Sequence, residues 1–137
     1  MSTTATFTTA SVDEMVVSQL NFYVRDAAKE TEAFVESATK YGLAYAVEWG
    51  ESAVRADHLA QYAGKVLRAV ERGDLTTRQA LAAYGKEVRE DLLNNRLRPS
   101  STGALHNASK LAQADAASRF VGTAEGFEGL YAEAEGE

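Results

Sequence analysis

Apolar residues recur every three or four positions along the first third of the chain. From Val12 to Trp49 they span 37 residues in ten steps, or 3.7 residues per step, which is close to the α-helical period. Ser11 and Glu14 have the spacing of a capping box, so we predict a helix over 12–49, about 55 Å long. The stripe consists of Val12, Val16, Leu20, Tyr23, Ala27, Thr31, Phe34, Ala38, Tyr41, Tyr45 and Trp49.

Turn and capping residues divide the rest of the chain into three shorter helices. Gly50 and Ser52 are typical of a helix end followed by a new N-cap, which predicts a second helix over 53–72. Without a break there, the first two helices would form one rod of about 90 Å. Gly73 and Thr76 predict a short link to a third helix over 77–95, and hence an αα-hairpin. A polar loop around Pro99 precedes a fourth helix over 104–121.

These elements predict an all-α fold: an elongated helical bundle built on one long N-terminal helix and an αα-hairpin, with flexible termini. Residues 11–121 would form a single helical domain. Residues 1–10 are rich in Ser and Thr and are expected to be a flexible arm. Residues 122–137 contain five Glu and four Gly after position 121, and we expect an acidic, glycine-rich tail.

The charge of the chain is acidic at both ends and basic in the middle. The net charge is −6, with −4 in residues 1–50, +2 in 51–100 and −4 in 101–137. This balance argues against non-specific binding to nucleic acid or to an anionic membrane. There is no cysteine, no secretory signal pattern and no run of 18 apolar residues. We therefore expect a protein of the cytoplasm, or of a viral particle assembled inside a cell, with no membrane contact.

No motif in the sequence carries chemistry with useful specificity. His58 lies on the apolar stripe of the second helix and His106 on a different element, and neither has the spacing of a metal-ligand pair. No Gly-x-Ser-x-Gly nucleophile motif or phosphate-binding glycine loop occurs. We expect no catalytic residue, no metal, no cofactor and no small-molecule substrate, and hence not an enzyme.

A basic stripe on the third helix is the main alternative, because it could contact the phosphates of a nucleic acid. Its arginines are spaced 11 and 7 residues apart and therefore share one helix face. Acidic residues are interleaved with them, and this weakens the basic field. Nucleic-acid binding is therefore the alternative and is not favoured. The candidate phosphate contacts are Arg78, Lys86, Arg89, Arg96 and Arg98.

Aromatic residues are concentrated on the first predicted helix, over an arc too wide for one neighbouring helix. The later helices are about 30 Å long and would not cover a 55 Å helix. We therefore expect a non-catalytic assembly or adaptor protein, either homo-oligomeric or docked in a larger complex, such as a viral or phage structural protein or one that binds a host factor. The candidate contacts for a protein partner or for self-association are Phe22, Tyr23, Phe34, Tyr41, Tyr45 and Trp49.

Overall fold

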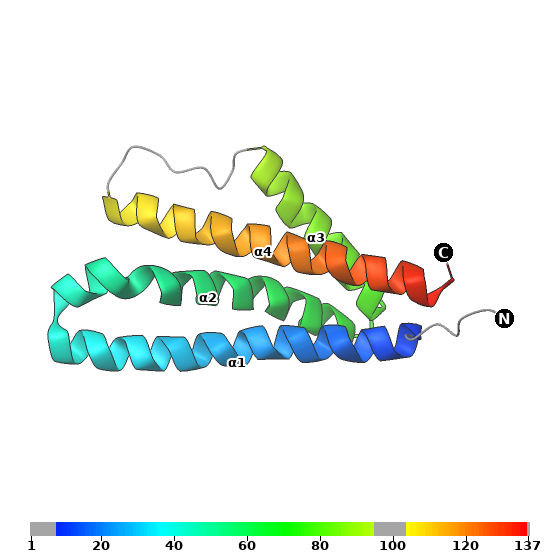
Figure 1. Cartoon of the computed structure of the whole chain (residues 1–137), viewed down its shortest axis with the longest axis horizontal. Coiled ribbons are helices and arrows are strands. Elements are labelled where there is room, and N and C mark those ends of the chain that lie inside the picture. The colour runs from blue at the N-terminus through cyan, green and yellow to red at the C-terminus, as the bar shows by residue number, and fades with distance from the viewer. Residues whose placement is uncertain (1–7, 95–103, 137) are drawn as a thin grey trace.

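Four α-helices pack against one another in the computed structural model, which describes residues 8–94 and 104–136 (Figure 1). They are α1 (Thr9–Tyr41), α2 (Leu43–Glu71), α3 (Thr77–Leu93) and α4 (Ala104–Ala134). Helices α1, α2 and α4 run alongside one another, and α3 crosses α4 at the end of the bundle where α1 begins and α4 ends. No strand occurs in the described residues, so the predicted all-α bundle is confirmed.

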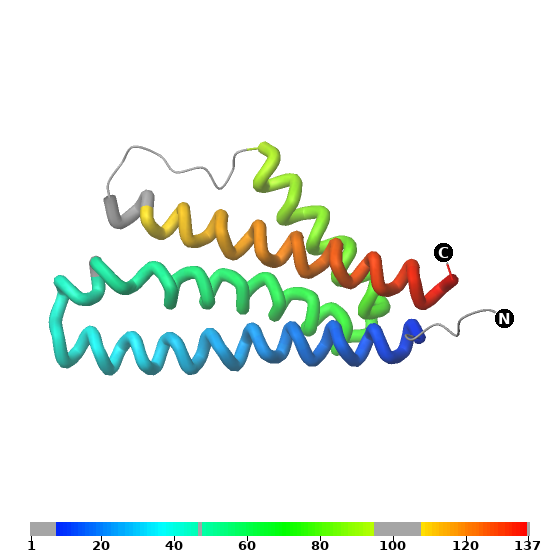
Figure 2. Tube along the Cα trace, in the orientation of Figure 1, coloured from blue at the N-terminus to red at the C-terminus, as the bar shows by residue number. Residues whose placement is uncertain are grey.

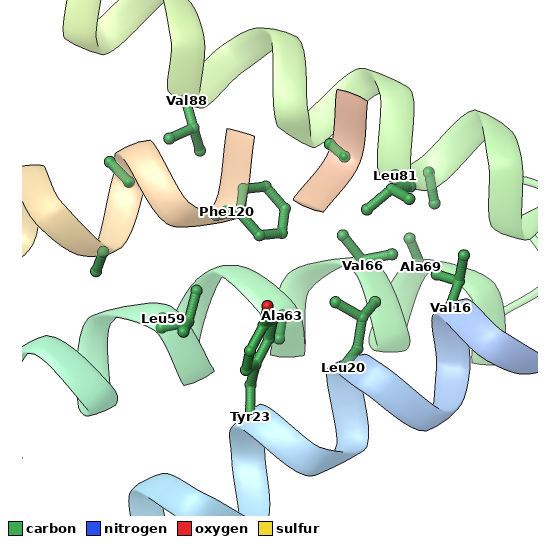
Figure 3. Packing of buried hydrophobic residues seen from close by; sticks show 14 of the residues in the cluster. Val16, Leu20, Tyr23, Leu59, Ala63, Val66, Ala69, Leu81, Val88 and Phe120 are labelled. Carbon is green, nitrogen blue, oxygen red and sulfur yellow. The ribbon is translucent and has the colours of Figure 1, made fainter. Parts of the chain in front are cut away.

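The hydrophobic core lies where all four helices meet (Figure 3). Helix α1 contributes a regular series of buried residues, Val12, Val16, Leu20, Tyr23 and Ala27. Phe120 of α4 is fully buried between the helices, and its ring centroid lies 5.5 Å from that of Tyr62 on α2. Fully buried alanines at 112, 116 and 117 allow the α4 backbone to approach α2 and α3 closely.

Helix α1 begins three residues earlier than the predicted start. Thr8 is the N-cap, and the reciprocal capping bonds run between Thr8 and Ser11: the Ser11 N–H donates to Thr8 Oγ1 at 3.0 Å, and the Thr8 N–H donates to Ser11 Oγ at 2.9 Å. The prediction that Ser11 caps the helix with Glu14 is therefore wrong. Ser11 serves as the third helical residue of an earlier box, because Thr8 offers the same hydroxyl acceptor. Of the expected N-terminal arm, residues 1–7 lie outside the described residues.

The chain reverses at Gly42, and not at Gly50 as predicted (Figure 2). Gly42 has φ +87° and ψ −170°, a backbone conformation that is essentially restricted to glycine. Gly50 lies inside α2 and faces Phe34 of α1, where an added Cβ would be 3.3 Å from the ring. The two glycines thus have different roles: Gly42 makes the turn, and Gly50 allows α1 and α2 to approach.

The predicted link between the second and third helices is confirmed. Gly73 has φ +76° and follows the end of α2. Thr76 caps α3 in a capping box with Gln79: the Gln79 N–H donates to Thr76 Oγ1, and the Thr76 N–H donates to Gln79 Oε1. These local signals were readable because a turn glycine and a capping hydroxyl act on their own neighbours.

The segment from Gly122 to Ala134, predicted as part of an acidic tail, continues helix α4. Phe120, Ala124 and Tyr131 lie on one face of it and are buried. Three glycines in this segment have open space where a Cβ would be. Each glycine costs a helix about 1 kcal/mol relative to alanine, but burying one large apolar side chain recovers about 1.5–3 kcal/mol. Burial therefore outweighs the weak helix propensity.

Three of the helices are similar in length, which removes one sequence-based argument for self-association. Helices α1, α2 and α4 have 33, 29 and 31 residues. At 1.5 Å per residue these are about 50, 44 and 47 Å long. The expectation that α1 is too long to be covered by its neighbours is wrong, since α1 ends at Tyr41 and α4 is extended by its last 13 residues.

Candidate protein-binding site

The α1–α2 hairpin continues beyond the core, and its outer part has a different surface. We define the hairpin tip as residues 28–58, which include the turn at Gly42. None of the described side chains in the tip is buried, whereas α1 buries five residues between Val12 and Ala27. Large apolar side chains are nevertheless present there, and four of them are more than half exposed: Val35, Tyr41, Leu43 and Trp49.

The aromatic side chains of the tip pack on one another instead of entering the core. The rings of Phe34 and Tyr45 stack with centroids 6.0 Å apart, and the Tyr41 ring lies 5.8 Å from that of Tyr45. The Lys40 ammonium lies 5.3 Å from the centroid of the Tyr41 ring. Such pairs contribute about 0.5–1.5 kcal/mol each beyond the burial of area. They hold a cluster of rings at the surface around the turn.

A groove of about 550 Å³ lies between the tip and the first turns of α4, and we call it the tip groove. Its floor is apolar: Phe34 and Val35 come from α1, Val54 from α2 and Ala108 from α4. The volume falls within the range of about 300–1,000 Å³ that is typical of ligand pockets. The described residues that line it are Thr31, Phe34, Val35, Ala46, Glu48, Gly50, Glu51, Ala53, Val54, Asp57, Ala108 and Ser109.

Every charged side chain among these lining residues is acidic: Glu48, Glu51 and Asp57. Glu51 forms an ion pair of 3.3 Å with Arg55 on the same helix, and Asp57 accepts a hydrogen bond of 2.7 Å from Gln61. The whole tip holds six acidic and three basic residues, a net charge of −3. Next to the groove, burial lowers the pKa of His58, an effect that Lys110 reinforces and Asp57 opposes. His58 therefore adds little positive charge at neutral pH.

The six aromatic residues expected to contact a partner fall into two groups. Phe34, Tyr41, Tyr45 and Trp49 belong to the hairpin tip. Phe22 is about half exposed on the outer face of α1. Tyr23 is a correction: it is 7% exposed, and its hydroxyl lies 2.8 Å from Thr123 Oγ1 on α4, so it is a core residue. The sequence pattern could not separate Tyr23 from the others because all of them share one helical period.

The basic stripe of α3 is paired with acidic residues of α4. The Arg78 guanidinium donates from Nε to Glu128 Oε2 at 3.0 Å and also bonds Glu135. Arg89 lies 3.5 Å from Glu125, and Lys86 is exposed beside it. Arg96 and Arg98 lie outside the described residues. Because two of the arginines already face carboxylates, the stripe is a weaker anion site than its sequence alone indicates.

Arg78 also belongs to a polar network that joins three helices. Its guanidinium lies over the Tyr131 ring, 5.2 Å from the centroid, and the Tyr131 hydroxyl donates to Asp13 of α1. The guanidinium lowers the pKa of the Glu128 carboxyl, chiefly through the hydrogen bond. Burial and the neighbouring Asp13 raise the pKa of Tyr131. Sequence reasoning missed Glu128 and Glu135, which lie seven residues apart on one face of α4.

Two other kinds of site were searched for in the same residues. No group of three His, Asp or Glu side chains gathers as a metal site in the part of the chain that the structure describes. None of the described helices is long and apolar enough to cross a membrane.

Comparison of this chain with protein-family models, with curated proteins and with solved structures found no match.

Proposed function

We propose that this protein is a non-catalytic helical adaptor or assembly protein that docks another protein chain through the hairpin tip. The observation that carries the proposal is the group of large apolar side chains exposed around the turn, Tyr41, Leu43 and Trp49. Leu43 is 84% exposed and Trp49 is 60% exposed. Exposed aromatic residues of this kind are enriched at the centres of protein interfaces.

Energetics favour a partner at this surface. Removing apolar area from water stabilises a complex by about 25 cal/mol per Å² before the entropic cost of association. The rings are already ordered by the Phe34–Tyr45 and Tyr41–Tyr45 contacts, so less conformational freedom is lost when a partner binds. The partner is a second copy of the chain or a different protein, inside a cell or in a particle assembled there.

Site-specific photo-crosslinking tests the proposal. A benzophenone amino acid replaces Trp49 in the full-length protein, which is irradiated in the cells that produce it. The matched control carries the same amino acid at Ser18, an exposed position of α1 at the core end of the bundle. We expect a discrete crosslinked species from position 49 and at least tenfold less from position 18. Equal crosslinking at both positions, or none at position 49, would show that the tip is not a docking surface.

The same experiment separates the two kinds of partner. A crosslinked species of about twice the chain mass of 14.8 kDa that contains only this protein identifies self-association. A species of another mass that contains peptides of a second protein identifies a different partner.

A further inference from the structure

We infer that the partner docks as a basic amphipathic helix laid in the tip groove. This inference rests on the proposed function and specifies the chemistry of the partner. A helix in a groove is recognised by apolar anchors at positions i, i+3 or i+4, and i+7 on one face, and by the charges that flank them. The tip groove meets both requirements.

The apolar floor has the right length for such a helix. The lining residues of α2 extend from Ala46 to Asp57, eleven steps along the helix. At 1.5 Å per residue this is about 17 Å, or three helical turns. Anchors at i and i+7 are about 10.5 Å apart and fit within that length. Phe34 and Val35 form one side of the floor and Ala108 the other, so a helix in the groove would contact three elements of the bundle.

Charge complementarity selects a basic partner. Glu48, Glu51 and Asp57 are the charged side chains among the described residues that line the groove. Glu48 is exposed and forms no hydrogen bond or ion pair within the described residues. Lysine or arginine residues flanking the anchors of a partner would therefore meet carboxylates that the fold leaves available, at a distance where salt weakens the attraction.

A second copy of this chain fits the groove less well. Its own tip carries a net charge of −3, so two tips that face each other bring like charges together. The four described helices also pair their apolar faces within the bundle, so none of them is a free amphipathic helix for a neighbour.

Binding of designed peptides tests the inference. The first probe is a fluorescein-labelled 18-residue helix with Leu at i, i+3, i+4 and i+7 and Lys elsewhere; the second has the same Leu positions and Glu in place of Lys. Fluorescence anisotropy against the full-length protein measures Kd for each peptide at low and at high salt. We expect the basic peptide to bind at least tenfold more tightly than the acidic one, with the difference reduced in 0.5 M salt.

Paired variants locate the binding in the groove. Removing two groove carboxylates with Glu48→Gln and Asp57→Asn is expected to weaken binding of the basic peptide five- to tenfold. The control, Glu87→Gln with Glu90→Gln, removes the same charge from exposed positions of α3 and is expected to change Kd less than twofold. Val54→Lys, which puts a cation on the floor of the groove, is expected to weaken binding further. Circular dichroism shows that each variant remains helical.

Several results would overturn the inference. They are equal weakening by the groove and control pairs, equal binding of the two peptides, or a homodimer in sedimentation that Trp49→Ser abolishes. In each of these cases crosslinking at position 49 still decides the proposed function by itself. A crosslinked partner together with failed peptide discrimination keeps the docking surface and rejects the basic helix.

Discussion

The two ends of the α1–α2 hairpin have the same periodic stripe but opposite surroundings. At the core end, α3 and α4 close over α1 and α2, and α1 buries five residues between Val12 and Ala27. At the tip the stripe continues through Phe34, Tyr41, Tyr45 and Trp49, but none of these side chains is buried. The comparison shows that a 3.7-residue period establishes a helix and its apolar face, whereas burial of that face depends on which other helices reach it.

The strongest test of this comparison is the same substitution at both ends. Phe120→Ala in the core is expected to lower the free energy of unfolding by about 3–5 kcal/mol, because it removes a fully buried ring and leaves a cavity. Phe34→Ala in the tip is expected to cost about 1 kcal/mol, because it removes mainly the stacking contact with Tyr45. Urea denaturation of the three proteins measures both values. Similar losses for the two variants would contradict the division into core and tip.

Glycine substitutions sharpen the comparison within the core end. A Cβ added at Gly85 of α3 would lie 2.8 Å from the Cβ of Ala124, so Gly85→Ala is expected to destabilise the protein by about 1–3 kcal/mol. The control is Gly122→Ala on α4, where nothing lies within 4 Å, and helix propensity is expected to raise stability by up to about 1 kcal/mol.

A compensating change identifies the cause of that loss. Adding Ala124→Gly to Gly85→Ala removes the clashing methyl group and is expected to restore part of the stability, as measured by thermal unfolding. Unchanged destabilisation in the double variant would indicate that close approach of α3 and α4 is not the reason for glycine at 85.

The Arg78 network makes stability at the core end dependent on pH. The folded protein holds the pKa of the Glu128 carboxyl below its ordinary value of 4.5. The unfolded chain therefore binds the proton more readily, so the contribution of Glu128 to stability is present above about pH 4.5 and is lost as the pH falls through the lower, folded pKa. We expect Glu128→Gln to lower Tm at pH 7 and the difference from the unmodified protein to shrink toward pH 3.

Glu133→Gln is the matched control, since Glu133 is exposed on the same helix and forms no ion pair within the described residues. Its Tm should follow that of the unmodified protein across the pH range. A difference for Glu128→Gln that stays constant between pH 7 and pH 3 would argue against the ion pair with Arg78.

The smallest expected effect on stability is at the tip surface. Leu43→Ser removes an apolar side chain that is 84% exposed, and the free energy of unfolding is expected to change by no more than about 0.5 kcal/mol. The same substitution is expected to reduce crosslinking from position 49 at least fivefold. A large loss of stability would instead show that Leu43 is part of the packed structure.

Local signals along the chain predicted much of the fold. Gly73 and Thr76 were correctly assigned, because a turn glycine and a capping hydroxyl act within a few residues. The choice between Gly42 and Gly50 was wrong, because either glycine can end a helix and only the approach of Phe34 to Gly50 shows which one is packed. The candidate site was predicted in part: four of its aromatics lie together at the tip, but Tyr23 is in the core.

The sequence by itself determined that the chain is helical, where its apolar stripes lie and how α2 connects to α3. These properties follow from periodicity and from interactions between near neighbours. Only the tertiary structure decided that residues 122–134 extend α4, that Arg78 faces Glu128 and that a groove with acidic residues lies beside the tip. Those outcomes depend on residues as far as 50 positions apart, whose meeting is set by helix packing and not by local propensity.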